Sequence, residues 1–145
     1  CGVSDPMETI KLNYPVEGGD LIGAGEASSK MKMALKKLDL PPETIRRASI
    51  CMYEGEINMV IHANGGRAEV EIAMDHIIIR MIDTGPGIPD VAQAMEEGFS
   101  TAGEIARDLG FGAGMGLPNM RRYSDEMDIQ TTVGMGTTVT MKINI

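Results

Sequence analysis

One stretch near the middle of the chain constrains the fold more than any other. An apolar, β-branched run ends on a carboxylate and passes into a turn of glycines and prolines, Ile77-Ile78-Ile79-Arg80-Met81-Ile82-Asp83-Thr84-Gly85-Pro86-Gly87-Ile88-Pro89. The run predicts a buried strand. A carboxylate at its end can accept from the exocyclic amine of a flat ring, and glycines let the backbone come close to that ring. The same residues are also typical of an ordinary turn. The motifs elsewhere in the chain are therefore needed to choose between a turn and a ligand site.

Length and charge exclude several classes of function. At 145 residues the chain predicts one domain, and its net charge of −8 argues against nucleic acid as a partner. A nucleotide stays open, because Mg²⁺ can supply positive charge. Two cysteines imply no disulfide framework, and no apolar run has membrane-spanning length, so we expect a cytoplasmic protein. Residues 1–6 are expected to be an expression remnant or a disordered extension before a domain over 7–145.

Hydrophobic periodicity predicts an alternation of strands and helices. Strands are expected over residues 9–16, 67–74, 77–83, 127–133 and 137–145, and helices over 26–38, 42–63, 90–97 and 117–123. The strands over 67–74 and 77–83 should form an antiparallel hairpin. Thr137 and Thr138 begin the last strand, and β-propensity alone explains at least one of them.

The helix over 42–63 carries three polar residues at a spacing of four, Glu54, Asn58 and His62. This spacing places them on one helix face, where polar residues usually meet solvent. The surrounding residues 57–61 are almost all apolar, however, which predicts burial and therefore partners for the polar groups. Gly55 costs about 1 kcal/mol in a helix interior and indicates close packing. For His62, a structural role is favoured over catalysis.

Small residues bracket the segment 98–112, which we expect to be a mobile lid. After it, Gly112-x-Gly114-x-Gly116 leads directly into a helical pattern that begins at Leu117. A glycine-rich loop that opens a helix presents free N–H groups to phosphates. The loop is neither a dinucleotide fingerprint nor a Walker A loop, because it does not follow the first strand of a βαβ unit and lacks Gly-Lys-Ser/Thr.

Taken in order, these motifs resemble those of the GHKL superfamily, which includes gyrase, the Hsp90 chaperone, histidine kinases and MutL. The closer resemblance is to the anti-sigma-factor and switch serine kinases of bacterial partner-switching modules, particularly stressosome-type switch kinases. It is carried by four segments, Asp83-Thr84-Gly85-Pro86-Gly87-Ile88-Pro89-Asp90, Met95-Glu96-Glu97-Gly98-Phe99-Ser100-Thr101, Gly114-Met115-Gly116-Leu117-Pro118 and Arg121-Arg122. The resemblance implies a Bergerat-type α/β two-layer sandwich, with a mixed, mostly antiparallel sheet and helices on one face.

The resemblance also implies roles for individual residues. Glu54 would be the general base, and Asn58 would hold Mg²⁺ and through it the phosphates of ATP or ADP. Asp83 would accept from the adenine amine. The remaining nucleotide-binding residues would be Gly85, Gly87 and Ile88 beside the ring, Thr138 near it, and Gly112, Gly114, Met115 and Gly116 around the phosphates. These roles agree with the chemistry, since a serine hydroxyl needs a base and phosphoryl transfer needs positioning and charge neutralisation.

The implied activity is that of a Mg-ATP-dependent protein serine/threonine kinase whose partner is a small antagonist of STAS fold. One alternative is an anti-sigma factor that mainly sequesters a sigma subunit, and another is a stand-alone histidine-kinase-like ATPase domain. The anti-sigma relatives dimerise, so a homodimer stays open. The chain departs from them beside the phosphate loop, where they carry an arginine and this chain has Gly112 or Ala113. Arg107 or Arg121 could replace it.

Overall fold

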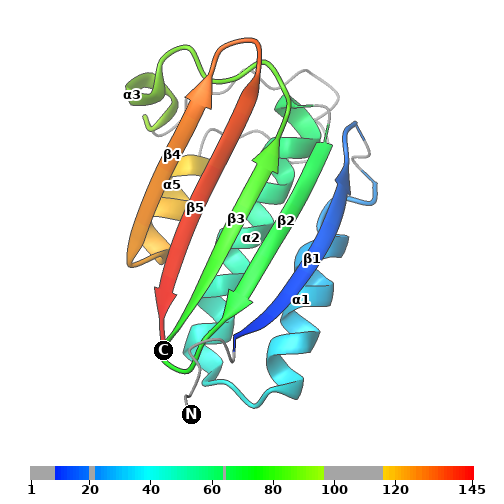
Figure 1. Ribbon diagram of the computed structural model, residues 1–145, viewed down its shortest axis with the longest axis vertical. Helices are drawn as coiled ribbons and strands as arrows, with labels where there is room; N and C mark the ends of the chain where they lie inside the picture. The colour runs from blue at the N-terminus through cyan, green and yellow to red at the C-terminus, as the bar shows by residue number, and fades with distance from the viewer. Residues whose placement is uncertain (1–8, 20–21, 64, 97–115) are drawn as a thin grey trace, which may run out of the picture.

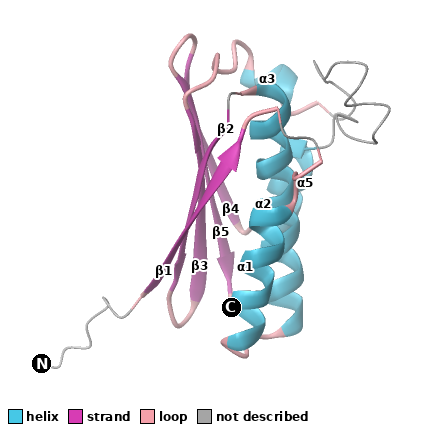
Figure 2. Cartoon of the chain, turned by 90° about the vertical axis from the view of Figure 1, so that its right-hand side faces the viewer, coloured by secondary structure: helices cyan, strands magenta, loops and turns pink. Residues whose placement is uncertain are grey.

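The protein forms two layers in the computed structural model, which describes residues 9–19, 22–63, 65–96 and 116–145 (Figures 1 and 2). One layer is a sheet of five strands, β1 (Ile10–Glu17), β2 (Gly65–Ile72), β3 (His76–Asp83), β4 (Glu126–Thr132) and β5 (Gly136–Asn144). The other layer contains helices α1 (Glu26–Lys37), α2 (Pro42–His62) and α5 (Gly116–Tyr123). A short helix, α3 (Val91–Ala94), lies near the end of β4 (Figure 1). The expected two-layer α/β sandwich is confirmed.

The strands lie in the order β1-β2-β3-β5-β4, and each neighbouring pair is antiparallel. A mixed sheet was expected, whereas the described strands form a wholly antiparallel one. The β2–β3 and β4–β5 connections are short, as antiparallel hairpins allow and parallel crossovers do not. β2 begins at Gly65 rather than at residue 67, because Gly66 already pairs with Val16 of β1 and with Asp83 of β3.

Alternation along β3 and β5 decides which side chains reach the helices. The helix-facing side chains are buried and apolar, and they are Ile77, Ile79, Met81, Val139, Met141 and Ile143. Because strand side chains alternate with a period of two, the same face receives Asp83 at the end of β3 and Thr137 opposite it on β5. The two central strands therefore carry the core and also deliver Asp83 to its helix-facing end.

Helix α2 is the central helix of the covering layer and contacts both α1 and α5 as well as the sheet. It starts with Pro42 in its first turn, as expected from the sequence. Gly55 lies on its buried face, where an added Cβ would sit 2.6 Å from Cγ of Met81. The close packing predicted at this glycine is confirmed, and it brings the α2 backbone directly onto β3.

The start of α1 is held by a residue of α2 that the sequence analysis passed over. Glu56 is only 3% exposed. Its Oε2 accepts hydrogen bonds from the backbone N–H groups of Gly25 (3.0 Å) and Ala27 (3.1 Å), and its Oε1 accepts from that of Ser28 (2.9 Å). These N–H groups have no partner within the helix and lie at the positive end of its dipole, so a carboxylate there stabilises α1.

The other end of α2 holds the C-terminal end of α5. The Arg47 side chain donates from Nε to the carbonyl of Tyr123 (3.1 Å) and pairs with Asp125 (2.6 Å). The same carboxylate accepts from the backbone N–H of Asn144 (2.7 Å), the last residue of β5. This arrangement fixes α5 against both α2 and the sheet.

The face of the sheet opposite the helices is polar and carries its own ion pairs. Arg80 of β3 pairs with Glu71 of β2, and Lys142 of β5 lies 3.6 Å from Glu126 of β4. The sheet has two edge strands, β1 with Pro15 within it and β4. Side chains with both signs of charge explain why this face needs no second helical layer.

Some expected elements lie outside the described residues, namely the extension over 1–6 and the lid over 98–112. The helix expected over 90–97 is described only as α3, where the Asp90 side chain accepts from the N–H of Gln93 (3.0 Å). Met74 lies in the β2–β3 turn rather than on a strand and is 95% exposed. Across the part of the chain that the structure describes, none of the helices combines the length and apolar character needed to cross a membrane.

Candidate functional site

Asp83 is fixed at the end of β3 through one of its two carboxylate oxygens. Its Oδ1 accepts from the backbone N–H of Gly85 (2.9 Å) and from that of Thr137 (3.2 Å). Both of these donors use the same oxygen, so Oδ2 is the oxygen that can accept from a ligand. A carboxylate held in this way is already oriented before a ligand arrives.

The turn after Asp83 packs tightly against the protein itself. An added Cβ on Gly85 would lie 2.7 Å from Cβ of Ala63, the residue that follows α2. Gly87 has φ of +79°, and its added Cβ would lie 2.6 Å from the carbonyl oxygen of Thr132. At both glycines the protein's own atoms fill the position that a Cβ would take, so no larger residue fits there. The close approach of backbone that was expected at these glycines is present, and their place beside a ring stays a prediction.

Threonine side chains connect the turn to the β4–β5 hairpin. Thr131 Oγ1 accepts from the N–H of Ile88 (2.9 Å) and lies 2.9 Å from Oγ1 of Thr137. Thr137 is only 7% exposed and is directly opposite Asp83. Thr138, the residue expected from the sequence, pairs with Ile82 and alternates to the other face of the sheet. The structure thus brings Thr137, not Thr138, to Asp83.

That one-residue difference has a plain cause. The resemblance implied Thr138, one of two adjacent threonines, and motif order along the chain does not show which of the two faces the helices. Counting back from Val139, Met141 and Ile143, the apolar residues of the same strand, identifies Thr137 as the helix-facing one. Thr131 belongs to no motif in the sequence, and its position opposite Thr137 follows only from the hairpin register.

The polar face of α2 is covered by the first turn of α5. Nδ2 of Asn119 donates to Oε2 of Glu54 at 2.8 Å. An added Cβ on Gly116, the first residue of α5, would lie 2.8 Å from Oδ1 of Asn58. Glu54 and Asn58 are both half-buried. They therefore face another helix, and the alternative of a fully solvated stripe does not hold for these two residues.

His62 lies one turn beyond Asn58 on the same helix and is half-buried. Burial lowers the pKa of its imidazole below the ordinary value of 6.5, because removal from water disfavours the charged form. The neutral ring is thus the form that suits this position. This agrees with the structural role expected for it.

Helix α2 connects the two parts of the site. Ala63 follows its last turn and contacts Gly85, while Glu54 and Asn58 lie further back along the helix. At 1.5 Å per residue, Glu54 and Ala63 are separated by roughly 13 Å along the axis. One rigid helix therefore sets the distance between the carboxylate of Glu54 and the Asp83 turn.

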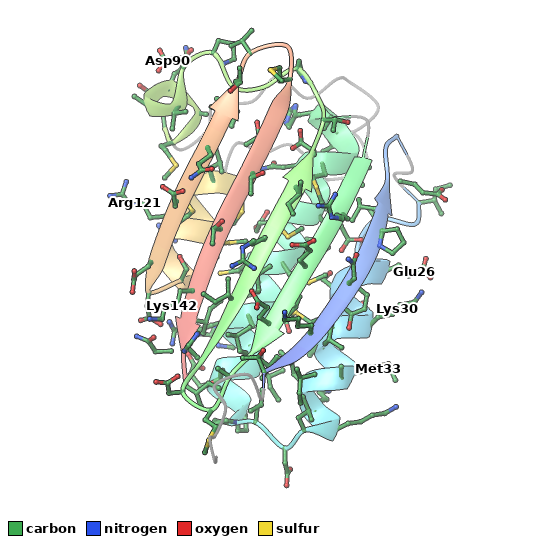
Figure 3. The ribbon with its side chains drawn as sticks, viewed as in Figure 1. Glu26, Lys30, Met33, Asp90, Arg121 and Lys142 are labelled. Carbon is green, nitrogen blue, oxygen red and sulfur yellow. The ribbon has the colours of Figure 1, made fainter. Side chains whose placement is uncertain are left out.

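The remaining expected residues divide into two groups. Gly112, Gly114 and Met115 lie outside the described residues, as does Arg107. Arg121 is described, and its exposed side chain points away from the sheet edge on α5 (Figure 3). The phosphate loop itself lies outside the described residues, so the replacement by Arg121 stays a prediction.

The arrangement fits a purine nucleotide. Asp83 offers Oδ2, which accepts no hydrogen bond from the described part of the chain, for an exocyclic amine. Gly116 begins a helix of eight residues beside the amide of Asn58. A helix N-terminus and a neutral amide oxygen suit a phosphate and its cation, respectively. The donors and acceptors present therefore match both ends of such a ligand.

Comparison with known proteins agrees with this geometry. Residues 47–145 match the histidine kinase-, DNA gyrase B- and HSP90-like ATPase family. The chain is 34% identical over 102 residues to the serine/threonine-protein kinase RsbT of Bacillus subtilis, covering 66% of this chain and 71% of that protein. It is 34% identical over 110 residues to the anti-sigma F factor of Caldanaerobacter subterraneus subsp. tengcongensis (72% of this chain, 73% of that one). It is 32% identical over 111 residues to an anti-sigma F factor of Bacillus licheniformis, with the same coverage.

These matches confirm the resemblance drawn from the sequence motifs. They include both a protein kinase and anti-sigma factors, which are the classes that the sequence brought forward. The matched region contains α2 from Arg47 onward together with the whole Asp83 turn and α5. This chain belongs to the histidine kinase-, DNA gyrase B- and HSP90-like ATPase family, in the branch that contains the serine/threonine kinase and anti-sigma factor relatives.

Proposed function

We propose that the chain is a Mg-ATP-dependent protein serine/threonine kinase of a partner-switching module that phosphorylates a serine on a small STAS-like antagonist. The observation that carries the proposal is the face of α2 where Glu54 and Asn58 lie one turn apart against the first turn of α5. A carboxylate and an amide so placed provide a base and a cation ligand within one site.

Adenine recognition is assigned to the Asp83 turn. Oδ2 of Asp83 accepts from the exocyclic amine, while the two backbone donors hold Oδ1. Ile88, fixed through its N–H to Thr131, contributes apolar surface beside the ring. The hydroxyl of Thr137 contacts that of Thr131 and so helps to hold Ile88 in place.

Phosphate and metal binding are assigned to Asn58 and the glycine-rich loop that ends at Gly116. Among the described residues no three His, Cys, Asp or Glu side chains gather to hold a metal ion. A magnesium site completed by nucleotide phosphates and water needs only one or two protein ligands, and Asn58 supplies one. When bound, Mg-ATP provides the phosphoryl group and the neutralising charge. Gly112, Gly114 and Met115 belong to this assignment through the family resemblance.

Glu54 is assigned as the general base. Its carboxylate accepts the proton of the substrate serine hydroxyl, which is a poor nucleophile until that proton is removed. Because Asn119 occupies Oε2, Oε1 is the oxygen that receives the proton. In Glu54, Oε2 is thereby held by Asn119 while Oε1 acts as the base.

The second candidate function is sequestration of a sigma subunit, favoured by the anti-sigma F factors among the relatives. The two functions share the nucleotide site and differ in what the protein does with its partner. A kinase leaves phosphate on the partner, whereas sequestration leaves the partner unmodified in a stable complex.

The test combines binding with transfer. Calorimetry should show ATP binding that strengthens with Mg²⁺, and radiolabelled ATP should mark a serine on a member of a panel of purified STAS-domain proteins. Glu54→Gln should abolish transfer and retain ATP binding. Glu69→Gln, on the polar face of the sheet, is the matched control and should behave as the wild type.

Three outcomes would count against the assignment. Absence of ATP binding would overturn the nucleotide site. Unchanged transfer by Glu54→Gln would remove the base assignment. ATP binding together with a stable sigma complex and no labelled protein would favour the anti-sigma alternative.

A further inference from the structure

We propose that Asn119 is a positioning residue for the carboxylate of Glu54, an inference that rests on the kinase function proposed above. Nδ2 of Asn119 lies 2.8 Å from Oε2 of Glu54, although the two residues are 65 positions apart in the chain. Only the NH₂ side of the amide can face an ionised carboxylate favourably, because the carboxylate accepts and does not donate. In this contact Asn119 is therefore the donor and Glu54 the acceptor.

A glutamate base needs such a partner. Its three side-chain torsions let the carboxylate sweep a wide volume, and proton transfer requires one oxygen within hydrogen-bond reach of the hydroxyl. A donor on Oε2 limits this motion while it leaves Oε1 for the substrate. Asn119 thus acts through Glu54 and needs no contact with the reacting atoms.

Asn119 is itself held rigidly, which makes it suitable for this task. Leu117 and Met120 on either side are buried against the core. At one end of α5, Gly116 lies directly on the Asn58 amide. At the other end, Arg47 donates to the carbonyl of Tyr123. A helix anchored at both ends keeps the short asparagine side chain at a constant distance from α2.

The test is kinetic. Asn119→Leu removes the donor while keeping a side chain that branches at Cγ, and kcat for transfer should fall by roughly 10- to 100-fold, as expected for a misplaced catalytic group. The KM and the dissociation constant for ATP should stay within about twofold of the wild type. Asn119→Asp should be at least as slow, because it opposes two carboxylates, and Asn119→Gln should recover part of the rate.

Two controls separate positioning from a general structural effect. Asn13→Leu makes the same change on exposed β1 and should leave kcat unchanged. The Asn119→Leu variant should also unfold at a urea midpoint close to that of the wild type, because a positioning role does not require a loss of overall stability. A wild-type kcat in Asn119→Leu would overturn the proposal, as would an equal loss of kcat in Asn13→Leu.

A readout without activity keeps this proposal distinct from the proposed function. The side-chain carboxyl ¹³C resonance of Glu54, assigned with Glu54→Gln, should shift between wild-type protein and Asn119→Leu in the absence of nucleotide. If it does not move, the positioning role is overturned whatever the enzyme does. If it moves but the wild type neither binds ATP nor transfers phosphate, the contact stands and the kinase function fails.

Discussion

The backbone N–H of Thr137 lies 3.2 Å from Oδ1 of Asp83, so neighbouring central strands jointly hold this carboxylate. The second donor, Gly85, comes from the turn that Asp83 itself begins. Orientation of Asp83 is thereby built from backbone groups, which no side-chain substitution removes. Changes to the Asp83 side chain can consequently be interpreted as changes in ligand contact.

Asp83→Asn should weaken ATP binding by roughly 10- to 100-fold, the range expected for a lost hydrogen bond to a charged group. The asparagine oxygen stays with the two backbone donors, and the NH₂ group is then turned toward the adenine amine, where two donors oppose each other. Calorimetry with ATP and Mg²⁺ measures the change. Wild-type affinity in this variant would rule out adenine recognition by Asp83.

Thr137→Val and Thr138→Val form a matched pair, since each keeps shape and β-propensity and removes one hydroxyl. Thr137→Val should reduce ATP affinity by about 3- to 10-fold, because it removes the hydroxyl contact to Thr131 that supports Ile88. Thr138→Val, on the other sheet face, should bind as the wild type. The reverse ranking in calorimetry would restore the assignment made from the sequence.

Gly55→Ala should destabilise the fold, although alanine is normally the better helix former by about 1 kcal/mol. The added methyl would meet buried Met81 at 2.6 Å, and overpacking typically costs about 1–3 kcal/mol. Urea unfolding gives the sign of the difference. Combining the change with Met81→Ala should relieve the clash, and strictly additive effects would show that the two residues do not interact in this way.

Glu56→Gln should lower the free energy of unfolding by about 2–3 kcal/mol, because one of its oxygens becomes an NH₂ group that faces the backbone donors of α1. Glu54→Gln, the same substitution two residues away, should leave stability nearly unchanged. Urea midpoints of the two variants provide the comparison. Equal midpoints would mean that the start of α1 does not depend on this carboxylate.

His62 should make stability fall as the solution becomes acidic below about pH 6.5. Burial lowers its pKa in the folded protein, so between the two pKa values the unfolded chain binds more protons, and stability rises with pH. Urea midpoints at pH 7.5 and 5.5 should therefore differ more in the wild type than in His62→Gln.

Other groups act in a separate pH range. The pKa of Asp125 is lowered by the N–H of Asn144 and by Arg47, so its contribution is lost only as pH falls below about 4. If the urea midpoint falls by the same amount between pH 7.5 and 5.5 in the wild type and in His62→Gln, the loss of stability in this range belongs to another group.

The sequence predicted the parts of the fold that depend on local pattern. The β3 run, the α2 helix and the close packing at Gly55 all follow from periodicity and from the placement of glycine and proline. It also led to Asp83, Glu54 and Asn58 as candidates, because motif order is visible along a chain. The family match confirms the fold class that those motifs implied.

The contacts that the sequence could not predict join residues far apart in the chain. In the sequence, Glu56 resembles an ordinary surface acid, because its partners at the start of α1 lie 28 to 31 residues away. Asn119 belongs to no motif in the sequence, and only the packing of α5 against α2 brings it to Glu54. In both residues the side-chain type is ordinary, and only the tertiary arrangement gives it a partner.

The edges of the sheet limit how this protein can meet another. Strand addition needs a continuous row of backbone donors and acceptors, and Pro15 removes one donor from β1. On the opposite edge, β4 alternates exposed Glu126, Asp128 and Gln130 with residues that face the helices. An incoming strand would find an incomplete row of donors on one edge and two exposed acidic side chains on the other. Both described edges of the sheet therefore disfavour the addition of another strand, and with it association of copies of this chain edge to edge.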